Sequence, residues 1–160
     1  MYLSRKSPPH ISTLILLAGL SAMVMNVFLP SLPGMTIYFD TDYSVMQLAV
    51  AGYLGASAVL QVLIGPISDQ IGRRPVLLWG IFLFLVSTLG CIYAPNATIF
   101  LIFRIAQAVI ATCLVLSRAI VRDVVEDSAA ASKIGFVTMG MSVVPMVAPA
   151  LGGLLEETWD

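Results

Sequence analysis

Charged residues are scarce in this chain, and their scarcity decides the class of protein. Asp, Glu, Lys and Arg together make up only 11% of the 160 residues, whereas hydrophobic residues make up 59%. A soluble domain carries about 25% charged residues and cannot bury this much apolar surface. The mean hydropathy of +0.97 therefore indicates a membrane protein. The net charge of −1 gives no basic patch for nucleic acid, so no nucleic-acid partner is expected.

The residues of most catalytic and metal sites are also scarce. The chain has one histidine, His10, and two cysteines, Cys91 and Cys113. No acid lies in an apolar run to act as a general base, so we do not expect an enzyme. Metal and nucleotide motifs are absent as well, and no cofactor is expected. The two cysteines should differ by roughly 20 Å in membrane depth, at about 1.5 Å of rise per residue, which disfavours a disulfide.

Five apolar runs are long enough to cross a bilayer, which takes about 20 helical residues. The predicted spans cover residues 10–29, 43–67, 75–94, 97–116 and 134–155. Pro30 and Pro33 should end the first span, and Pro95-Asn96 should form a hairpin between the third and fourth. The first run is too long for a signal-peptide core and lacks a small-residue cleavage pattern. The sequence thus predicts an all-α membrane protein with five transmembrane helices.

An amphipathic stretch follows the fourth predicted span. Arg118, Arg122 and Glu126 recur at intervals of four residues, with apolar residues between them. This pattern predicts an interfacial helix after Leu116. Asp127-Ser128 should break that helix and cap the next.

Basic residues lie on alternate loops, which predicts the orientation of the chain. Opposite loops contain no Lys or Arg and carry acids instead. The basic loop residues are Arg5, Lys6, Arg73, Arg74, Arg118, Arg122 and Lys133, and the opposing acids are Asp40, Asp42, Glu156, Glu157 and Asp160. The positive-inside rule places the amino terminus in the cytoplasm.

A charged turn between the second and third spans carries the first motif. Gly65 and Gly72 permit tight backbone geometry, Asp69 can accept hydrogen bonds, and Arg73 and Arg74 place positive charge at the inner interface. A topology anchor alone would explain the arginines but not the acid and two glycines. The spacing G-x-x-x-D-x-x-G-R-R resembles the loop between spans two and three of the major facilitator superfamily. The resemblance implies that Asp69 and Arg73 hold the cytoplasmic side closed when the transporter faces outward.

Arg104 is the single charge within a predicted span. A guanidinium about 10 Å inside the membrane costs at least a few kcal/mol, so it should face a polar bundle interior together with Gln107, one turn away. The alternative is an arginine that snorkels to the outer interface. The run Arg104 to Ala108 resembles the family's R-x-x-Q-G motif, implicated in proton coupling, with Ala108 in place of glycine. Arginine keeps its proton, so it would bias a nearby acid or hold an anionic group.

The fifth span contains Pro145, Pro149, Gly152 and Gly153. Prolines four residues apart remove two backbone donors and predict a kink against which another helix packs closely. A simple kink site and a functional site are equally open on physical grounds alone. The pattern P-x-x-A-P-x-x-G-G resembles the antiporter motif of the bicyclomycin and chloramphenicol resistance subfamily, which implies an exporter. Residues 28–33 and 117–123 resemble the same subfamily.

Asn26 departs from that subfamily. A carboxylate commonly precedes the L-P-x-L-P exit of the first span, and asparagine cannot carry a proton. Asn26 could hydrogen-bond a substrate in the cavity or a neighbouring helix. Because no Asp or Glu lies in the five spans, the coupling ion stays open.

The resemblance covers residues 11–153 but only the first part of a twelve-span family. It implies a partial amino-terminal six-helix bundle that lacks its sixth span and the carboxy-terminal half of the transporter. The implied function is drug efflux by proton antiport with alternating access. The partners would be the bilayer, a drug-like small molecule, protons and the missing half. A same-fold exporter of a small metabolite, or a truncated or regulatory fragment that transports nothing, are the alternatives.

Overall fold

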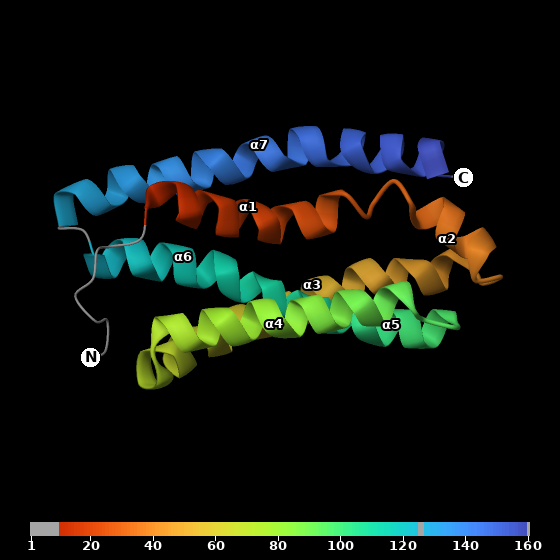
Figure 1. Cartoon of the computed structure of the whole chain (residues 1–160), viewed down its shortest axis with the longest axis horizontal. Helices are drawn as coiled ribbons and strands as arrows, with labels where there is room; N and C mark the ends of the chain where they lie inside the picture. Colours follow the sequence, from red (N-terminus) through yellow and green to blue (C-terminus); the bar gives the residue numbers. More distant parts are fainter. Residues whose placement is uncertain (1–9, 125–126, 160) are drawn as a thin grey trace.

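The computed structural model describes residues 10–124 and 127–159, and within them all regular elements are helical. The elements are α1 (Ile11–Asn26), α2 (Leu32–Tyr38), α3 (Tyr43–Ile71), α4 (Arg73–Ile92), α5 (Ala97–Ala106), the 3-10 helix η1 (Gln107–Ile110), α6 (Ala111–Val124) and α7 (Asp127–Trp159). The long helices run side by side along one axis (Figure 1). Four segments are long and apolar enough to cross a membrane, namely Tyr43–Ile71, Arg73–Ile92, Ala97–Asp123 and Ile134–Leu155. The apolar helix α1 is shorter, at 16 residues.

The first helix ends earlier than the sequence predicted. The apolar run continues to Leu29, but α1 stops at Asn26 and the chain turns before α2 begins at Leu32. The reason is Pro30, because a proline disfavours helical geometry in the residue before it. Pro33 stands in the first turn of α2, where a helix tolerates proline. The hairpin predicted at Pro95-Asn96 is present, and the Asn96 side chain caps α5 by accepting from the Ile99 amide at 2.9 Å.

The predicted turn over residues 65–75 is wrong in extent. Helix α3 continues through Gly65 and Pro66 to Ile71, and α4 begins at Arg73. Gly72 alone is non-helical, with φ +106°, a conformation that favours glycine. Pro66 lacks a backbone donor, so the Val62 carbonyl loses its intrahelical partner although α3 continues past this point. Gly65 therefore makes no turn, and the reversal rests on Gly72.

The fourth predicted span does not end at Leu116. It comprises α5, η1 and α6, and α6 runs on to Val124. One side of this amphipathic stretch is packed inside the bundle, as the buried residues Ser117, Ile120 and Val121 show. The sequence predicted that a helix continues beyond Leu116, and α6 does so, with the apolar side of that pattern packed against α1 and α3. Glu126 lies outside the described residues.

Helix α7 packs along α1, its neighbour in space but its most distant partner in sequence (Figure 1). Two glycines lie in this contact. A Cβ added at Gly140 would collide with the Ile15 side chain, whereas a Cβ added at Gly19 would be in ordinary van der Waals contact with Val144. Small residues bring the two backbones close, as they do in lipid. Helix α7 begins at Asp127, where the sequence predicted a new helix, but the predicted cap side chains of Asp127 and Ser128 lie outside the described residues.

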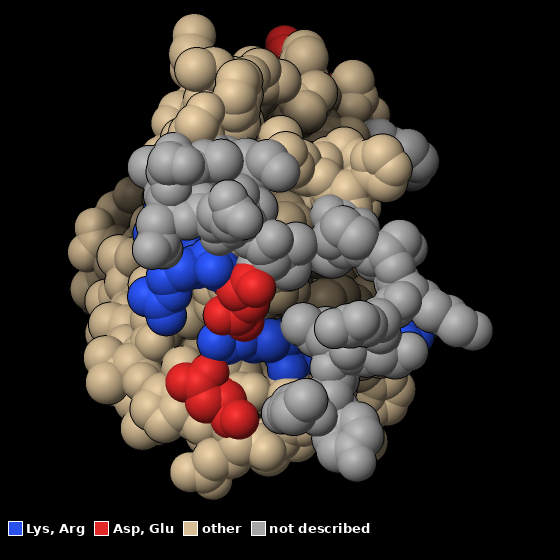
Figure 2. All heavy atoms as spheres, turned by 90° about the vertical axis from the view of Figure 1, so that its left-hand side faces the viewer, with Lys and Arg blue, Asp and Glu red and all other residues tan. Residues whose placement is uncertain are grey.

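Charges separate to the two ends of the bundle. The described basic residues other than Arg104 occupy the α3–α4 turn and the last turns of α6, namely Arg73, Arg74, Arg118 and Arg122. Basic and acidic side chains gather at this end of the molecule (Figure 2). Asp40 and Asp42 lie at the opposite end, between α2 and α3. The orientation argument also used residues that lie outside the described ones, namely Arg5, Lys6, Asp160 and the side chains of Lys133 and Glu156.

Candidate functional site

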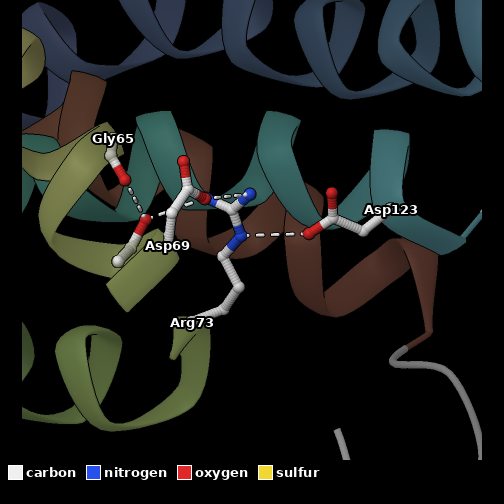
Figure 3. Close-up of polar contacts among 5 residues, drawn as sticks. Gly65, Asp69, Arg73 and Asp123 are labelled. Atoms are coloured by element: carbon white, nitrogen blue, oxygen red, sulfur yellow. Dashed lines mark hydrogen bonds and ion pairs between the residues drawn. The ribbon is translucent and has the colours of Figure 1, made fainter. Parts of the chain in front are cut away.

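Arg73 is the centre of a polar network at the basic end of the bundle (Figure 3). Its Nη2 lies 2.8 Å from Asp69 Oδ1, and its Nε donates to Asp123 Oδ2 at 3.0 Å. Its Nη1 donates to the hydroxyl of Ser68 at 2.8 Å. The guanidinium thus connects the end of α3, the start of α4 and the end of α6.

The members of this network differ in exposure. The Arg73 side chain is 13% exposed, that of Asp123 34% and that of Asp69 62%. Ser68 is buried and donates in turn to the carbonyl oxygen of Gly65 at 2.9 Å. Solvent-exposed ion pairs contribute only about 0–1 kcal/mol each, so this network can break and reform. Arg74, predicted as part of the same motif, is exposed and takes no part in these bonds.

Arg104 forms a second network deep in the bundle. Its side chain points inward, since the residue is only 4% exposed, which confirms the predicted orientation and contradicts snorkelling. Nη1 donates to Gln107 Oε1 at 2.7 Å, and Nη2 donates to the Val24 carbonyl oxygen at 3.1 Å. The guanidinium carbon lies 4.0 Å from the centre of the Phe28 ring and 4.9 Å from that of Tyr53. Both rings offer cation–π attraction.

The bond from Arg104 to Val24 follows from the early end of α1. A helix leaves its last four carbonyl groups without intrahelical donors, and its carboxyl end carries a partial negative charge of about half an electron. Because α1 stops at Asn26, Val24 is in its last turn. Arg104 therefore caps α1 from another helix. Gln107 extends the network to α4, donating from Nε2 to Thr88 Oγ1 at 2.9 Å.

A cavity of about 390 Å³ lies beside Arg104. Arg104, Gln107, Thr88 and Ser31 contribute its polar groups, and most of the remaining lining is apolar, including Phe28 and Phe100. Volumes of about 300–1,000 Å³ are typical of small-molecule sites. The cavity is thus large enough for a compact organic molecule, with one cation in its wall.

Asn26 stands apart from this cavity. Its Nδ2 donates to the carbonyl oxygen of Ala22 at 2.8 Å, one turn back on the same helix. Asn26 is not among the residues that line the cavity. Of the three residues that the sequence grouped for coupling, the structure brings together Arg104 and Gln107 but not Asn26. Its amide bonds its own helix and neither of the two partners expected.

The proline and glycine motif of α7 has one member in a critical contact. Gly152 is buried against the backbone of Val27, where α1 ends, so that an added Cβ would collide with the Val27 carbonyl oxygen. Gly153 has nothing within 4 Å of the corresponding position. Helix α7 is continuous through Pro145 and Pro149 and curves gently in Figure 1. Close packing at this site therefore depends on Gly152.

Comparison with known proteins identifies the family. The model of the Major Facilitator Superfamily matches residues 14–159. The chain belongs to the major facilitator superfamily. It is 38% identical over 141 residues to the uncharacterized MFS-type transporter YdgK of Bacillus subtilis, covering 88% of this chain and 35% of the relative. It is 37% identical over 139 residues to a chloramphenicol resistance protein of Pseudomonas aeruginosa, covering 86% and 33% respectively.

Multidrug resistance protein D of Escherichia coli is similar too, at 32% identity over 149 residues, which cover 92% of this chain and 38% of that protein. The chain spans about a third of the length of these relatives. It is accordingly a multi-pass membrane chain of the major facilitator type, corresponding to part of such a transporter.

The sequence did not predict several of the groups that bond to Arg73 and Arg104. Asp123 on α6 accepts a hydrogen bond from Arg73, although the two residues are fifty positions apart in the sequence. Its signal was present, because residues 117–123 resembled the drug-resistance subfamily. Ser68 and the Val24 carbonyl carried no such signal, since a hydroxyl or a backbone oxygen acquires its role only through the fold.

Proposed function

We propose that this chain is the amino-terminal part of a bacterial inner-membrane drug exporter. The whole protein would exchange a drug-like molecule for protons by alternating access, with its amino terminus in the cytoplasm. The names of the P. aeruginosa and E. coli relatives support resistance by transport. The proposal includes no enzymatic step.

The observation that carries this proposal is the buried Arg104 in the wall of an otherwise largely apolar cavity. An arginine with a purely structural role would be expected to be enclosed by protein atoms, and not to border a cavity of this size. Gln107 of η1 and the Phe28 ring, just after α1, contact the guanidinium, and Thr88 of α4 holds the Gln107 amide in place. Such a fixed group suits the recognition of a molecule that enters and leaves.

The Arg73 network supports alternating access. It joins three helices through contacts that are partly exposed and individually weak. A gate must be closed in one state and open in another, so weak polar contacts at an end of the bundle suit it. In this proposal Asp69, Arg73 and Asp123 close the cytoplasmic side, and the bonds break when the transporter turns inward.

Proton coupling requires a group that can gain and lose a proton, and none of the residues that line the cavity beside Arg104 is an Asp, Glu or His. Arg104 keeps its proton at any physiological pH, and the amide side chain of Asn26 has no ionisable proton. We propose that the proton carrier lies in another part of the whole transporter. Arg104 would then favour the ionised form of that acid when the cavity holds no substrate, and would bind an acceptor group of the substrate when it does.

The test is drug accumulation in bacteria that lack their own exporters and express the full-length protein. Radiolabelled chloramphenicol should accumulate less with the wild type than with an empty vector, and an uncoupler should remove the difference. Arg104→Lys should reach the membrane in similar amount but lose most export, because an ammonium cannot bond Gln107 and Val24 while lying flat on Phe28.

Arg118→Lys is the matched control, since Arg118 is exposed and distant from the cavity. Export that persists with the uncoupler would refute proton antiport. Wild-type accumulation equal to the vector across a panel of drugs would refute drug export and leave a metabolite exporter or a non-transporting protein.

A further inference from the structure

The charge of Arg104 is held in place by neutral groups. Both ion pairs that the described residues form belong to Arg73, and Arg104 has neither an Asp nor a Glu as a partner among them. Gln107, the Val24 carbonyl and two aromatic rings orient the guanidinium. Dipoles and rings attract a cation, but they do not neutralise it.

The guanidinium also keeps unused donors. Arginine has five N–H groups, and two of them donate to Gln107 and Val24. The Nε group is buried and has no hydrogen-bond partner in the described part of the chain. A buried donor without a partner costs about 1–3 kcal/mol, and more when it is charged. Because Nε is enclosed by protein atoms, a ligand in the cavity would have to accept from the remaining Nη hydrogens, and an anionic acceptor would do so most strongly.

The surroundings of this donor restrict the rest of the ligand. Arg104 borders the cavity of about 390 Å³, whose lining also includes Phe28, Phe100 and Met35. Such a wall suits an apolar or aromatic body, with one end that can accept hydrogen bonds. It disfavours lipophilic cations, because like charges repel and the guanidinium of Arg104 is largely buried.

We propose that the cavity binds a small organic monoanion with an apolar body, whose carboxylate or phenolate accepts hydrogen bonds from Arg104. This inference rests on the proposed function, because it names the class of molecule that the exporter binds. A carboxylate offers two oxygens to the planar guanidinium and neutralises its charge at the same time. Neutral molecules with a carbonyl or nitro acceptor bind less tightly, and cations are excluded.

Cys91 provides a direct readout of binding. It lines the same cavity and is partly exposed, whereas Cys113 is completely buried among the helices. N-ethylmaleimide should therefore modify Cys91 and leave Cys113 unmodified in the folded protein. A ligand in the cavity should slow the modification of Cys91. Mass spectrometry of the Cys91 peptide reports this whether or not the protein transports.

The experiment uses the purified full-length protein and three probes with the same ring system. These are 2-naphthoate, 2-naphthamide and 2-naphthylmethylammonium, which differ in charge while the apolar body is constant. Naphthoate should protect Cys91 at a concentration at least about tenfold lower than the amide, the effect of one hydrogen bond to a charged group. The ammonium should give no protection.

Arg104→Gln should abolish the advantage of the anion, and Arg118→Gln, which removes an exposed arginine, should retain it. The wild-type series alone decides the proposal if Arg104→Gln does not fold. Equal protection by anion and amide, or protection by the cation, would overturn the anion preference. Protection by naphthoate without chloramphenicol export would refute drug export but leave the anion site standing. Chloramphenicol export without preferential protection by naphthoate would refute the anion site but leave drug export standing.

Discussion

At the scale of single residues, two arginines of similar chemistry have opposite environments. Arg73 has two carboxylates and a hydroxyl around it near the end of the bundle. Arg104 has an amide, a backbone carbonyl and two rings around it in the interior. The first arrangement suits contacts that exchange during a cycle, and the second suits a charge that stays in place.

Asp123 should matter as much to export as Asp69, although the motif in the sequence contains only Asp69. Asp69 and Arg73 are four residues apart, whereas the 3.0 Å bond to Asp123 joins α4 to α6. Asp123→Asn removes the charge that attracts Arg73 across the helices. We expect it to lower drug export by full-length protein at least as far as Asp69→Asn, at unchanged membrane abundance. Arg122→Gln, one position away and exposed, is the control. Wild-type export by Asp123→Asn would exclude this acid from the gate.

The sequence predicted single residues well where local chemistry decides their position. A lone arginine in an apolar span must face inward, so the environment of Arg104 was predictable from the cost of exposing its charge to lipid. The bond to Val24 was not, because it depends on where α1 ends and on which helix approaches that end. Asn26 was placed in the cavity by analogy with a family motif, and its bond to Ala22 shows why position in a motif does not fix a side chain.

At the scale of elements, helix interiors were predicted better than helix ends. Apolar length located α3, α4 and the membrane part of α7, because lipid allows little else. The ends of helices depend on small differences in free energy that the sequence does not reveal. Pro30 shortens α1, whereas Pro66 does not end α3. Helix α6 continues beyond Leu116 because the bundle buries one side of it. A charged pattern such as 117–126 can face a membrane surface or a neighbouring helix, and its sequence does not distinguish them.

The glycine pair of α7 allows a test with a built-in control. Gly152→Ala would place a methyl group against the Val27 backbone, which cannot move aside like a flexible side chain. Gly153→Ala adds the same atom where nothing lies within 4 Å. Overpacking costs about 1–3 kcal/mol, so Gly152→Ala should lower the thermal unfolding temperature of the purified protein by several degrees. Gly153→Ala should leave it unchanged or raise it. Equal midpoints for both variants would show that α1 and α7 are not in close contact there.

At the scale of the whole molecule, charge gives the bundle a polarity. The described arginines outside the interior lie at the Gly72 end, and Asp40 and Asp42 lie at the other. Helices that alternate in direction bring these loops to two faces, as Figure 1 shows. From the positive-inside rule we propose that the Gly72 end faces the cytoplasm.

Reporter fusions test this assignment. A fluorescent protein fused after Arg74 should fluoresce, because it folds in the cytoplasm, and alkaline phosphatase fused there should be inactive. After Asn96 the two signals should reverse, since α4 carries the chain across the membrane. The opposite pair of results would invert the orientation and move the Arg73 network to the external side.

The pairing of α1 with α7 has a consequence for biosynthesis. About one hundred residues separate Asn26 from Asp127, and ribosomes add about 5–20 residues per second. The first helix therefore waits roughly 5–20 s in the translocon or the bilayer before its partner is made. During that interval the surface around Gly19 and the carbonyl of Val27, which Gly152 later covers, is open to other chains. Until α7 is made, this surface of α1 lacks the partner that covers it in the folded bundle.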